Sequence, residues 1–373
     1  MNTIESMVVR GPLAWEPLPT PPPRRRFLLW ALPILALLLA LLAAITFTLP
    51  YYAIAPGSAR QVNDLIDVPE DRSFPPRGKF LLATVALSRV TPLEAVRGWF
   101  DPDTDVVPEK RILGPARRRQ FNQLNLRAMD DSKQTAAVVA LRRLGFSVAE
   151  EGKGALIEVV EKISPAGDRL SQGEVITGVD GQPIRLAEQA LEAIRGKRPG
   201  DLVRLDIQSA SGAGRVEEIV LGSRPGTRVG FLGVVLRTKE RRFDYPFDVT
   251  IDSGAIGGPS AGLAFTLGVL DTLTAGELTG GKKVAVTGTI EIDGTVGDVG
   301  GVAQKTAAVR AAGADYFLVP PKEFRDAKAH AGRRLKIVSV ANLDEALAAL
   351  GHLGGDVTAL GTSGGRAVTG GPG

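Results

Sequence analysis

The first apolar stretch of the chain has the length of a membrane helix. Residues Phe27–Leu49 carry no charged side chain and are almost entirely apolar. At about 1.5 Å of rise per residue, a helix of this length crosses a hydrocarbon core of about 30 Å, and a membrane helix tolerates a proline such as Pro33. The pattern therefore predicts a transmembrane helix over 27–49, preceded by an unstructured, proline-rich tail over 1–26.

The charges beside this run predict its orientation. Arg24–Arg26 stand directly before it, and the first charge beyond it is Arg60. By the positive-inside rule the tail is cytoplasmic, and the chain after residue 50 lies outside the cell membrane. The alternative is a cleaved signal peptide, because Ala53–Ala55 has the small-x-small form of a cleavage site. The apolar run is longer than usual for such a peptide, and Pro56 would hinder the cut.

The segment 50–149 shows few regular patterns, and we interpret it as a juxtamembrane region. A linker rich in proline and glycine leads to a strand predicted over Phe80–Leu87. A helix is predicted over Asp131–Leu144, where the apolar residues have a helical period. Residues 92–127 give no clear prediction, and Arg117–Arg119 within them is interpreted as a solvated face.

From about residue 150 the pattern changes to short strands and then to alternating strands and helices. Up to 225 it predicts a small, mostly β domain with one amphipathic helix over Leu186–Ile194. From 229 to 350 it predicts an α/β or α+β unit. The glycine-rich segment 351–373 is predicted to be disordered. Strands of the β domain are predicted at Leu156–Val160, Val175–Val179, Val203–Ile207 and Val216–Leu221.

Composition removes several classes of chemistry. With 44% hydrophobic and 23% charged residues, the chain has enough apolar material for buried cores. It has no cysteine, and its only histidines are His330 and His352. Thiol catalysis, disulfides and most histidine-dependent chemistry are thereby excluded. A net charge of +4 is a weak argument for nucleic-acid binding. We expect no metal, no cofactor and no nucleic-acid partner.

One segment has the spacing of a phosphate-binding loop without its chemistry. Gly276–Lys283 ends in a lysine where a magnesium-binding serine or threonine is needed, and it precedes a predicted strand. We interpret it as a turn and expect no nucleotide partner.

A candidate nucleophile lies in the sequence GGPSAG, residues Gly257–Gly262. Pro259 suits the first position of a helix, which places Ser260 in the first turn, among backbone N–H groups without helical partners. Those donors and the helix dipole stabilise an oxyanion, and neighbouring glycines such as Gly258 allow a substrate backbone to approach closely. Taken alone, a capping or surface serine is the simpler interpretation.

A candidate base lies in the sequence GGVAQK, which ends at Lys305. On the predicted helix Val302–Ala312, this lysine shares a side with apolar residues, whereas Gln304 and Arg310 lie elsewhere. A lysine buried near a helix N-terminus loses its proton more readily, and it can then activate a serine hydroxyl. Taken alone, a lysine that snorkels to water is the simpler interpretation.

Together these motifs resemble the proteolytic domain of Lon. The resemblance covers Asp252–Val319 and implies a Lon-type fold over 229–350 without a cofactor. It implies that Ser260 is the nucleophile, that Lys305 is its base and that Thr287 supports the lysine. Two departures stand out: Gly257 occupies a position that is usually acidic in Lon, and no ATPase motif is visible.

The preceding domain, 150–225, resembles a bacterial PDZ domain in Ser164–Ala166 and Gly173–Gly181. The resemblance implies a groove between Leu156–Val160 and the helix Leu186–Ile194, in which a peptide adds as an extra strand. The alternative is a small β-sandwich that only packs on its neighbour. The groove residues implied by the resemblance are Gly154, Ala155, Leu156 and Ile157.

The order of the three parts resembles the membrane-anchored, PDZ-containing Lon-like proteases of bacteria. It implies an ATP-independent serine endopeptidase that cleaves protein or peptide substrates on the extracytoplasmic side of the cell membrane. Lon-type domains tend to assemble into rings, so a homo-oligomer is also implied. The alternative is a non-catalytic, membrane-anchored PDZ adaptor whose Lon-like domain is inactive.

Overall fold

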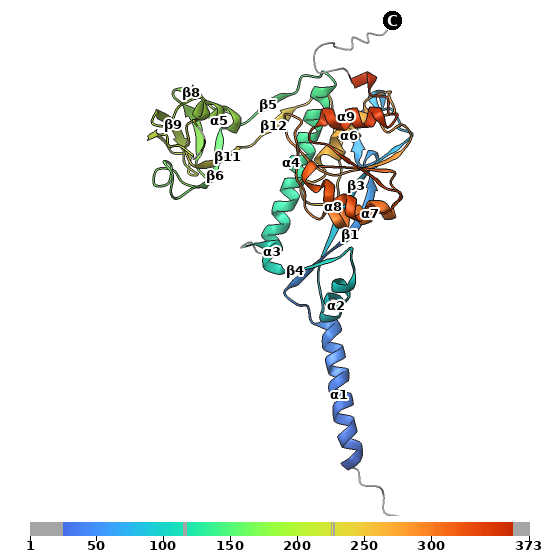
Figure 1. The fold of residues 1–373 in the computed structure, drawn as a ribbon. Coiled ribbons are helices and arrows are strands. Elements are labelled where there is room, and N and C mark those ends of the chain that lie inside the picture. The colour runs from blue at the N-terminus through green and yellow to red at the C-terminus, as the bar shows by residue number, and fades with distance from the viewer. Residues whose placement is uncertain (1–24, 115–117, 225, 227, 361–373) are drawn as a thin grey trace, which may run out of the picture. The chain divides into compact units, whose positions relative to one another are not determined.

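The computed structural model describes residues 25–114, 118–224, 226 and 228–360, and its chain divides into two units (Figure 1). The first unit holds the described residues up to Ala53 together with Leu87–Ile112. The second holds Ile54–Ala86 and the described residues from Leu113 onward. The tail predicted over 1–26 lies almost wholly outside the described residues.

Helices dominate the first unit. It contains α1 (Arg25–Thr46), α2 (Pro92–Phe100) and β4 (Asp105–Pro108), and α3 (Glu109–Leu113) leads into the second unit. α1 forms where the apolar run was predicted to be helical. Over the described residues, no helix has both the length and the apolar character required to cross a membrane, so the predicted transmembrane helix is not confirmed.

A mixed sheet forms the centre of the second unit. Its strands follow the order β18-β17-β14-β3-β1, and β14 is parallel to both β17 and β3. Strands from before and after the β domain thus share one sheet. The sheet therefore extends beyond the unit predicted over 229–350, because β1 and β3 belong to the same layer as the later strands. Their bounds are β1 (Tyr51–Gln61), β3 (Lys79–Arg89), β14 (Lys283–Val286), β17 (Tyr316–Val319) and β18 (Lys336–Ser339).

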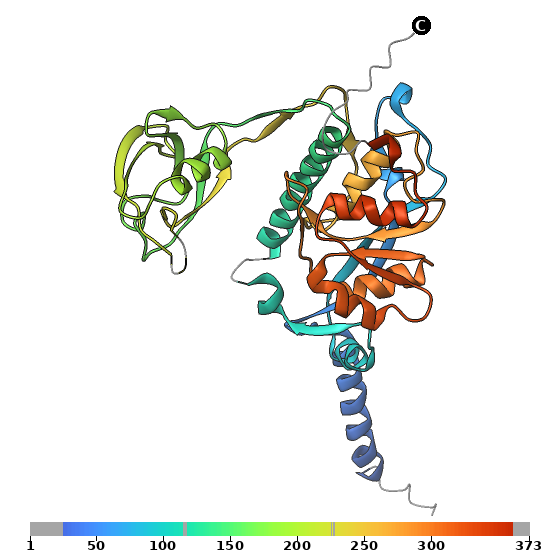
Figure 2. The ribbon, with the colours of Figure 1, turned by 45° about the horizontal axis from the view of Figure 1, so that its top comes forward.

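Helices cover both faces of this sheet (Figure 2), as expected for parallel strands that are buried on both sides. Alternate strand residues point to opposite layers. Phe80 and Leu82 pack in one core with α4, α6 and α9, whereas Leu81 and Ala83 pack in another with α7 and α8. The helices are α4 (Arg118–Arg143), α6 (Gly262–Thr272), α7 (Val302–Ala311), α8 (Phe324–His330) and α9 (Leu343–His352).

The β domain is a second sheet with the order β10-β9-β7-β6-β11, covered by α5 (Ala187–Arg195). The chain enters it through β5 (Ala149–Glu151) and leaves through β12 (Arg242–Asp244), and these two strands pair with each other. The domain is thus an insertion carried on a two-stranded ribbon. Its strands are β6 (Ala155–Val160), β7 (Val175–Val179), β9 (Leu202–Gln208), β10 (Gly214–Val220) and β11 (Val234–Thr238).

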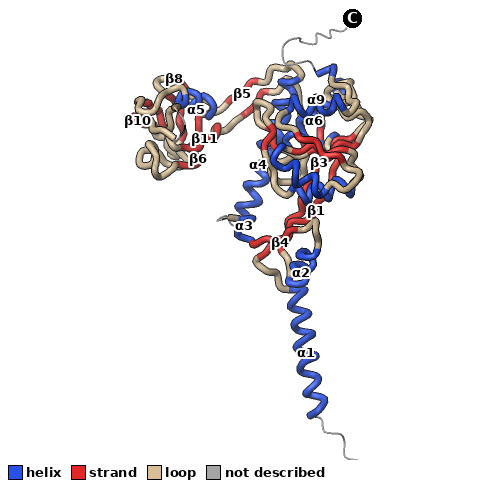
Figure 3. Tube along the Cα trace, viewed as in Figure 1, coloured by secondary structure: helices blue, strands red, loops and turns tan. Residues whose placement is uncertain are grey.

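Short elements complete the second unit (Figure 3). β2 (Ile66–Asp67) pairs with β13 (Thr250–Ile251), β15 (Thr289–Ile290) with β16 (Val296–Gly297), and β8 (Gln182–Pro183) with β7.

The C-terminal segment is ordered further than predicted. The prediction of disorder from residue 351 is wrong up to Leu360, whose side chain is buried in the core beside α9. Lys282 Nζ donates a hydrogen bond to the carbonyl of Leu353, and Gly355 N–H donates to Leu350 at 2.9 Å. Glycines here allow close packing against other backbone, which composition alone does not reveal. Residues 361–373 lie outside the described residues.

Candidate active site

Ser260 lies in the turn that leads into α6, two residues before the first helical residue, Gly262. The sequence placed it inside the first turn of a helix that starts at Pro259. The helix starts later because the Pro259 carbonyl accepts a turn hydrogen bond from Gly262 N–H at 3.3 Å. Gly258 has a φ of +92°, which favours glycine at this bend.

Two backbone donors beside the serine are unused. Among the described residues, neither Ser260 N–H nor Ala261 N–H makes a hydrogen bond. They lie at the N-terminal end of α6, where the helix dipole favours negative charge. The pair has the character of an oxyanion site, as the sequence predicted for this helix end.

α4 holds the loop that carries Ser260. The Asn125 carbonyl accepts a hydrogen bond from Gly258 N–H at 2.8 Å. The buried Ser132 hydroxyl donates to the Pro259 carbonyl at 3.0 Å. Sequence reasoning missed both residues, since neither lies in a recognisable motif and each meets the loop only through tertiary packing.

Lys305 lies on the first turns of α7 and is almost fully buried, with 3% of its surface exposed. The structure corrects the expectation that Gln304 lies away from the buried side, because that residue is only 2% exposed. The helix is enclosed on nearly all sides between the sheet and its neighbours. The lysine is therefore desolvated by the whole layer rather than by one apolar stripe.

Thr287 connects the lysine to the serine. Lys305 Nζ donates a hydrogen bond to Thr287 Oγ1 at 3.1 Å, and Thr287 Oγ1 donates to the Ser260 carbonyl at 3.2 Å. That carbonyl also accepts Gly288 N–H at 3.0 Å. The structure thus brings together Ser260, Thr287 and Lys305, with Gly258 beside them. Within the described part of the chain, the Ser260 hydroxyl itself makes no hydrogen bond.

Burial changes the acid–base behaviour of the lysine. Desolvation lowers the pKa of Lys305 to about 8, and the nearby carboxylate of Glu323 acts in the opposite direction. An amine with this pKa is partly neutral near neutral pH and can accept a proton. In the described residues no group of three His, Cys, Asp or Glu side chains is placed to hold a metal ion.

The groove residues implied by the PDZ resemblance are placed where no peptide strand can add. β6 pairs with β11 on one edge and, at Ala155 and Leu156, with β7 on the other. Gly154 N–H is bonded to the Arg185 carbonyl and Ile157 N–H to the Glu174 carbonyl, at 2.9 and 2.8 Å. The expected peptide site at Gly154, Ala155, Leu156 and Ile157 is therefore wrong, because these backbone groups are already used.

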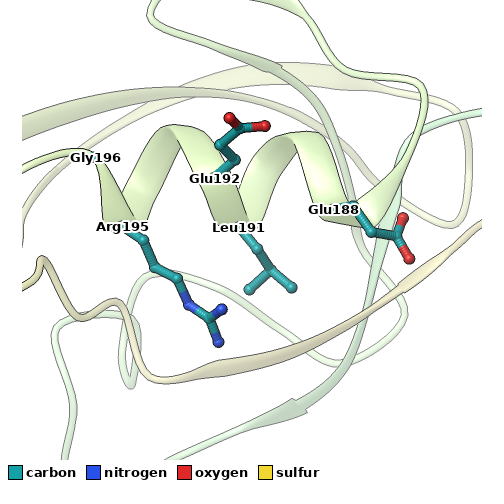
Figure 4. A pocket seen from close by; sticks show the side chains of 5 residues that line it. All are labelled: Glu188, Leu191, Glu192, Arg195 and Gly196. Atoms are coloured by element: carbon teal, nitrogen blue, oxygen red, sulfur yellow. The ribbon is translucent and has the colours of Figure 1, made fainter. Parts of the chain in front are cut away.

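β11 lies at one end of the sheet and has an open edge. Among the described strands it pairs only with β6, and α5 meets it where Ala187 N–H donates to Thr238 Oγ1 at 2.9 Å. A pocket lies along α5, with Leu191 and Arg195 projecting from one side of the helix (Figure 4). The sequence did not reveal this site, because β11 comes more than thirty residues after α5 (counted from Arg195 to Val234).

Two segments of the chain match known families. Residues 237–351 match the Lon protease (S16) C-terminal proteolytic domain, and residues 143–211 match the PDZ domain. A Lon protease of Rickettsia typhi is 31% identical over 109 residues, which cover 28% of this chain and 14% of that protein. Lon protease 2 of Bacillus subtilis is 26% identical over 195 residues, covering 47% of this chain and 34% of that one.

The solved structures that are similar to this chain include PDZ domains. The PDZ domain of an SdrC-like protein from Listeria monocytogenes has a TM-score of 0.21 and 24% identity, covering 22% of this chain and 87% of that one. The chain spans only about 14% of the length of the first of its curated relatives. The two matches thus relate residues 237–351 to the Lon proteolytic domain and residues 143–211 to the PDZ domain.

Proposed function

We propose that this protein is a serine endopeptidase in which Ser260 is the nucleophile and Lys305 is the general base. The observation that carries the proposal is the buried lysine, whose pKa is lowered to about 8 and whose amine is bonded to Thr287 beside the serine. A lysine is seldom buried without a partner carboxylate unless the site uses its neutral form. The alternative of an inactive adaptor gives no reason for such a desolvated amine.

The chemistry follows from these positions. The neutral amine of Lys305 takes the proton of the Ser260 hydroxyl while Oγ attacks the substrate carbonyl carbon. The resulting oxyanion is stabilised by the N–H groups of Ser260 and Ala261. The Lys305 ammonium then gives its proton to the leaving amine, and the acyl group stays on Ser260. Water, activated by the amine in turn, hydrolyses this ester and frees the serine.

Thr287 has a positioning role in this scheme. Its hydroxyl donates to the Ser260 carbonyl, so its lone pairs face the amine of Lys305. The threonine therefore limits where the amine can turn and keeps it beside the nucleophile. The hydrogen bond between the Ser260 hydroxyl and the Lys305 amine would form with substrate bound, as catalytic hydrogen bonds often do.

The wider setting is also part of the proposal. The apolar run Phe27–Leu49, with Arg24–Arg26 before it, supports anchoring in the cell membrane with the catalytic domain outside. The PDZ domain would position protein substrates at the open edge of β11 beside α5. Gly276–Lys283 forms a turn that runs into β14, which supports cleavage that does not depend on ATP.

Active-site labelling tests the nucleophile. The full chain in detergent should react with a fluorophosphonate probe and cleave an unfolded protein, and Ser260→Ala should abolish both. Ser209→Ala, on an exposed loop of the PDZ domain, is the matched control and should behave like the native protein. Labelling or cleavage that survives in a folded Ser260→Ala variant would remove Ser260 from the reaction. A native chain that neither labels nor cleaves would support the adaptor instead.

A further inference from the structure

α2 has two unlike faces. Ala95 and Gly98 are buried, and a Cβ added at Gly98 would come within 2.6 Å of the Val106 side chain, so the helix lies tightly on β4. The large apolar side chains of the same helix are exposed instead. Their exposed fractions are 43% for Leu93, 45% for Val96, 67% for Trp99 and 84% for Phe100.

These four side chains form one surface. At about 100° per residue they project within an arc of roughly 120°, turned away from Ala95 and Gly98. The charged residues of the helix lie outside this arc. Glu94 is engaged in a capping box with Thr91, and Arg97 lies at the flank. A helix that buries small residues and exposes large apolar ones requires a partner for the exposed face.

The position of α2 within the first unit indicates which partner this is. Leu49, three residues beyond the end of α1, donates its N–H to the Val90 carbonyl at 2.8 Å. Thr91, the next residue, is the N-cap of α2. The helix therefore begins where the chain leaves α1 (Figure 1), whose own apolar side chains from Leu32 to Ile45 are largely exposed.

We propose that α2 lies in the interfacial layer of the membrane, with Leu93, Val96, Trp99 and Phe100 inserted among the lipids. Tryptophan and phenylalanine at one end of a short amphipathic helix suit the boundary between headgroups and acyl chains. The lipid surface is favoured over a second copy of the chain because the apolar face of α2 continues from the exposed apolar surface of α1. This inference rests on the proposed anchoring.

The tryptophans of the chain allow a direct test, since there are only three of them, Trp15, Trp30 and Trp99. The full chain is reconstituted in vesicles of phosphatidylcholine and phosphatidylglycerol, with the phosphatidylcholine brominated at carbons 6 and 7 of one acyl chain. One variant, Trp15→Phe with Trp30→Phe, reports on α2. A second, Trp15→Phe with Trp99→Phe, reports on α1. Acrylamide serves as the quencher from water.

If α2 is interfacial, the brominated lipid should reduce Trp99 fluorescence at least twofold, and acrylamide should quench it weakly. If the brominated lipid quenches Trp30 but not Trp99, and acrylamide quenches Trp99 strongly, the inference would be overturned and the anchor would remain supported. Trp99 shielded from both quenchers would indicate a protein contact, such as a second copy, and would also overturn it. Absence of lipid quenching at both positions would reject the anchor together with the inference.

Discussion

At the scale of single residues, the site depends on hydrogen bonds that reach it from outside the two motifs. Ser132 and Asn125, both on α4, bind the carbonyl of Pro259 and the N–H of Gly258. These bonds hold the loop on either side of the bend that presents Ser260. The loop that carries Ser260 is therefore fixed by a helix that precedes it by more than a hundred residues.

Removing the Ser132 hydroxyl should impair catalysis more than folding. Ser132→Ala leaves the Pro259 carbonyl without this donor, which costs about 1 kcal/mol and lets the loop move. We expect kcat on a short peptide to fall about tenfold with little change in KM or Tm. Thr135→Ala, on the same helix, is the control and should keep native kcat. Equal rates in the two variants would show that the Ser132 bond does not position Ser260.

The pKa of Lys305 predicts the pH dependence of the reaction. Only the neutral amine accepts the serine proton, so the rate should rise with pH and reach half its maximum near the lowered pKa of about 8. The Glu323 carboxylate raises the pKa of this lysine, so Glu323→Gln should move the half-maximum to lower pH. Asp326→Asn, at an exposed position of α8, should not move it. A rate that rises only toward the pKa of free lysine would contradict a desolvated base.

The sequence could propose the candidate catalytic residues but not the residues that hold them in place. Ser260, Lys305 and Thr287 belong to local motifs. Such motifs can be recognised in the sequence without knowledge of tertiary contacts. Asn125 and Ser132 act through contacts between distant segments, which no local pattern encodes. The burial of Lys305 was expected from one apolar stripe, whereas the structure encloses α7 on almost every side.

At the scale of elements, local patterns predicted most helices and strands, but they did not predict which elements lie side by side. β7 follows the predicted bounds, because its apolar run ends at turn residues. Strand order is a tertiary property. The sequence therefore did not show that β11 would cover the edge of β6, and the groove was assigned to the wrong strand. It also did not reveal β1, whose small and polar residues hide its pattern.

The ribbon of β5 and β12 makes the PDZ domain removable. Lys153 N–H donates to the Lys239 carbonyl at 2.9 Å, so two glycines can replace the residues between them without stretching the ribbon. The shortened chain should cleave a short peptide within about twofold of the native rate. Its cleavage of an unfolded protein should fall severalfold if the PDZ domain positions substrate. A matched loss on both substrates would mean that the domain only stabilises the fold.

At the scale of the whole molecule, one sheet joins strands from both sides of the inserted domain. β3 lies beside β14, although about two hundred residues separate them (Lys79 to Lys283). Such pairing makes the segment before the β domain an integral part of the sheet that carries the candidate site. Truncation of the chain to residues 229–350 would remove β1, β3 and α4, and with them the residues that hold the Ser260 loop.

The absence of cysteine makes the orientation of the chain measurable. Ile163 is 99% exposed on the PDZ domain, so Ile163→Cys introduces one reactive thiol there. In intact cells a membrane-impermeant maleimide should label this variant. Ser6→Cys, in the tail, should react only after the cells are opened. The opposite pattern would refute an extracytoplasmic catalytic domain.

The most direct test of the central claim replaces the proposed base. A guanidinium stays protonated, so Lys305→Arg cannot accept the serine proton, and Lys305→Met fills the same buried space with no base. With Lys322→Arg as an exposed control, we expect cleavage of a short peptide by both Lys305 variants to fall at least about a thousandfold while circular dichroism remains native. The control should keep full activity. A folded Lys305 variant that retains most of its activity would contradict the Ser260–Lys305 mechanism.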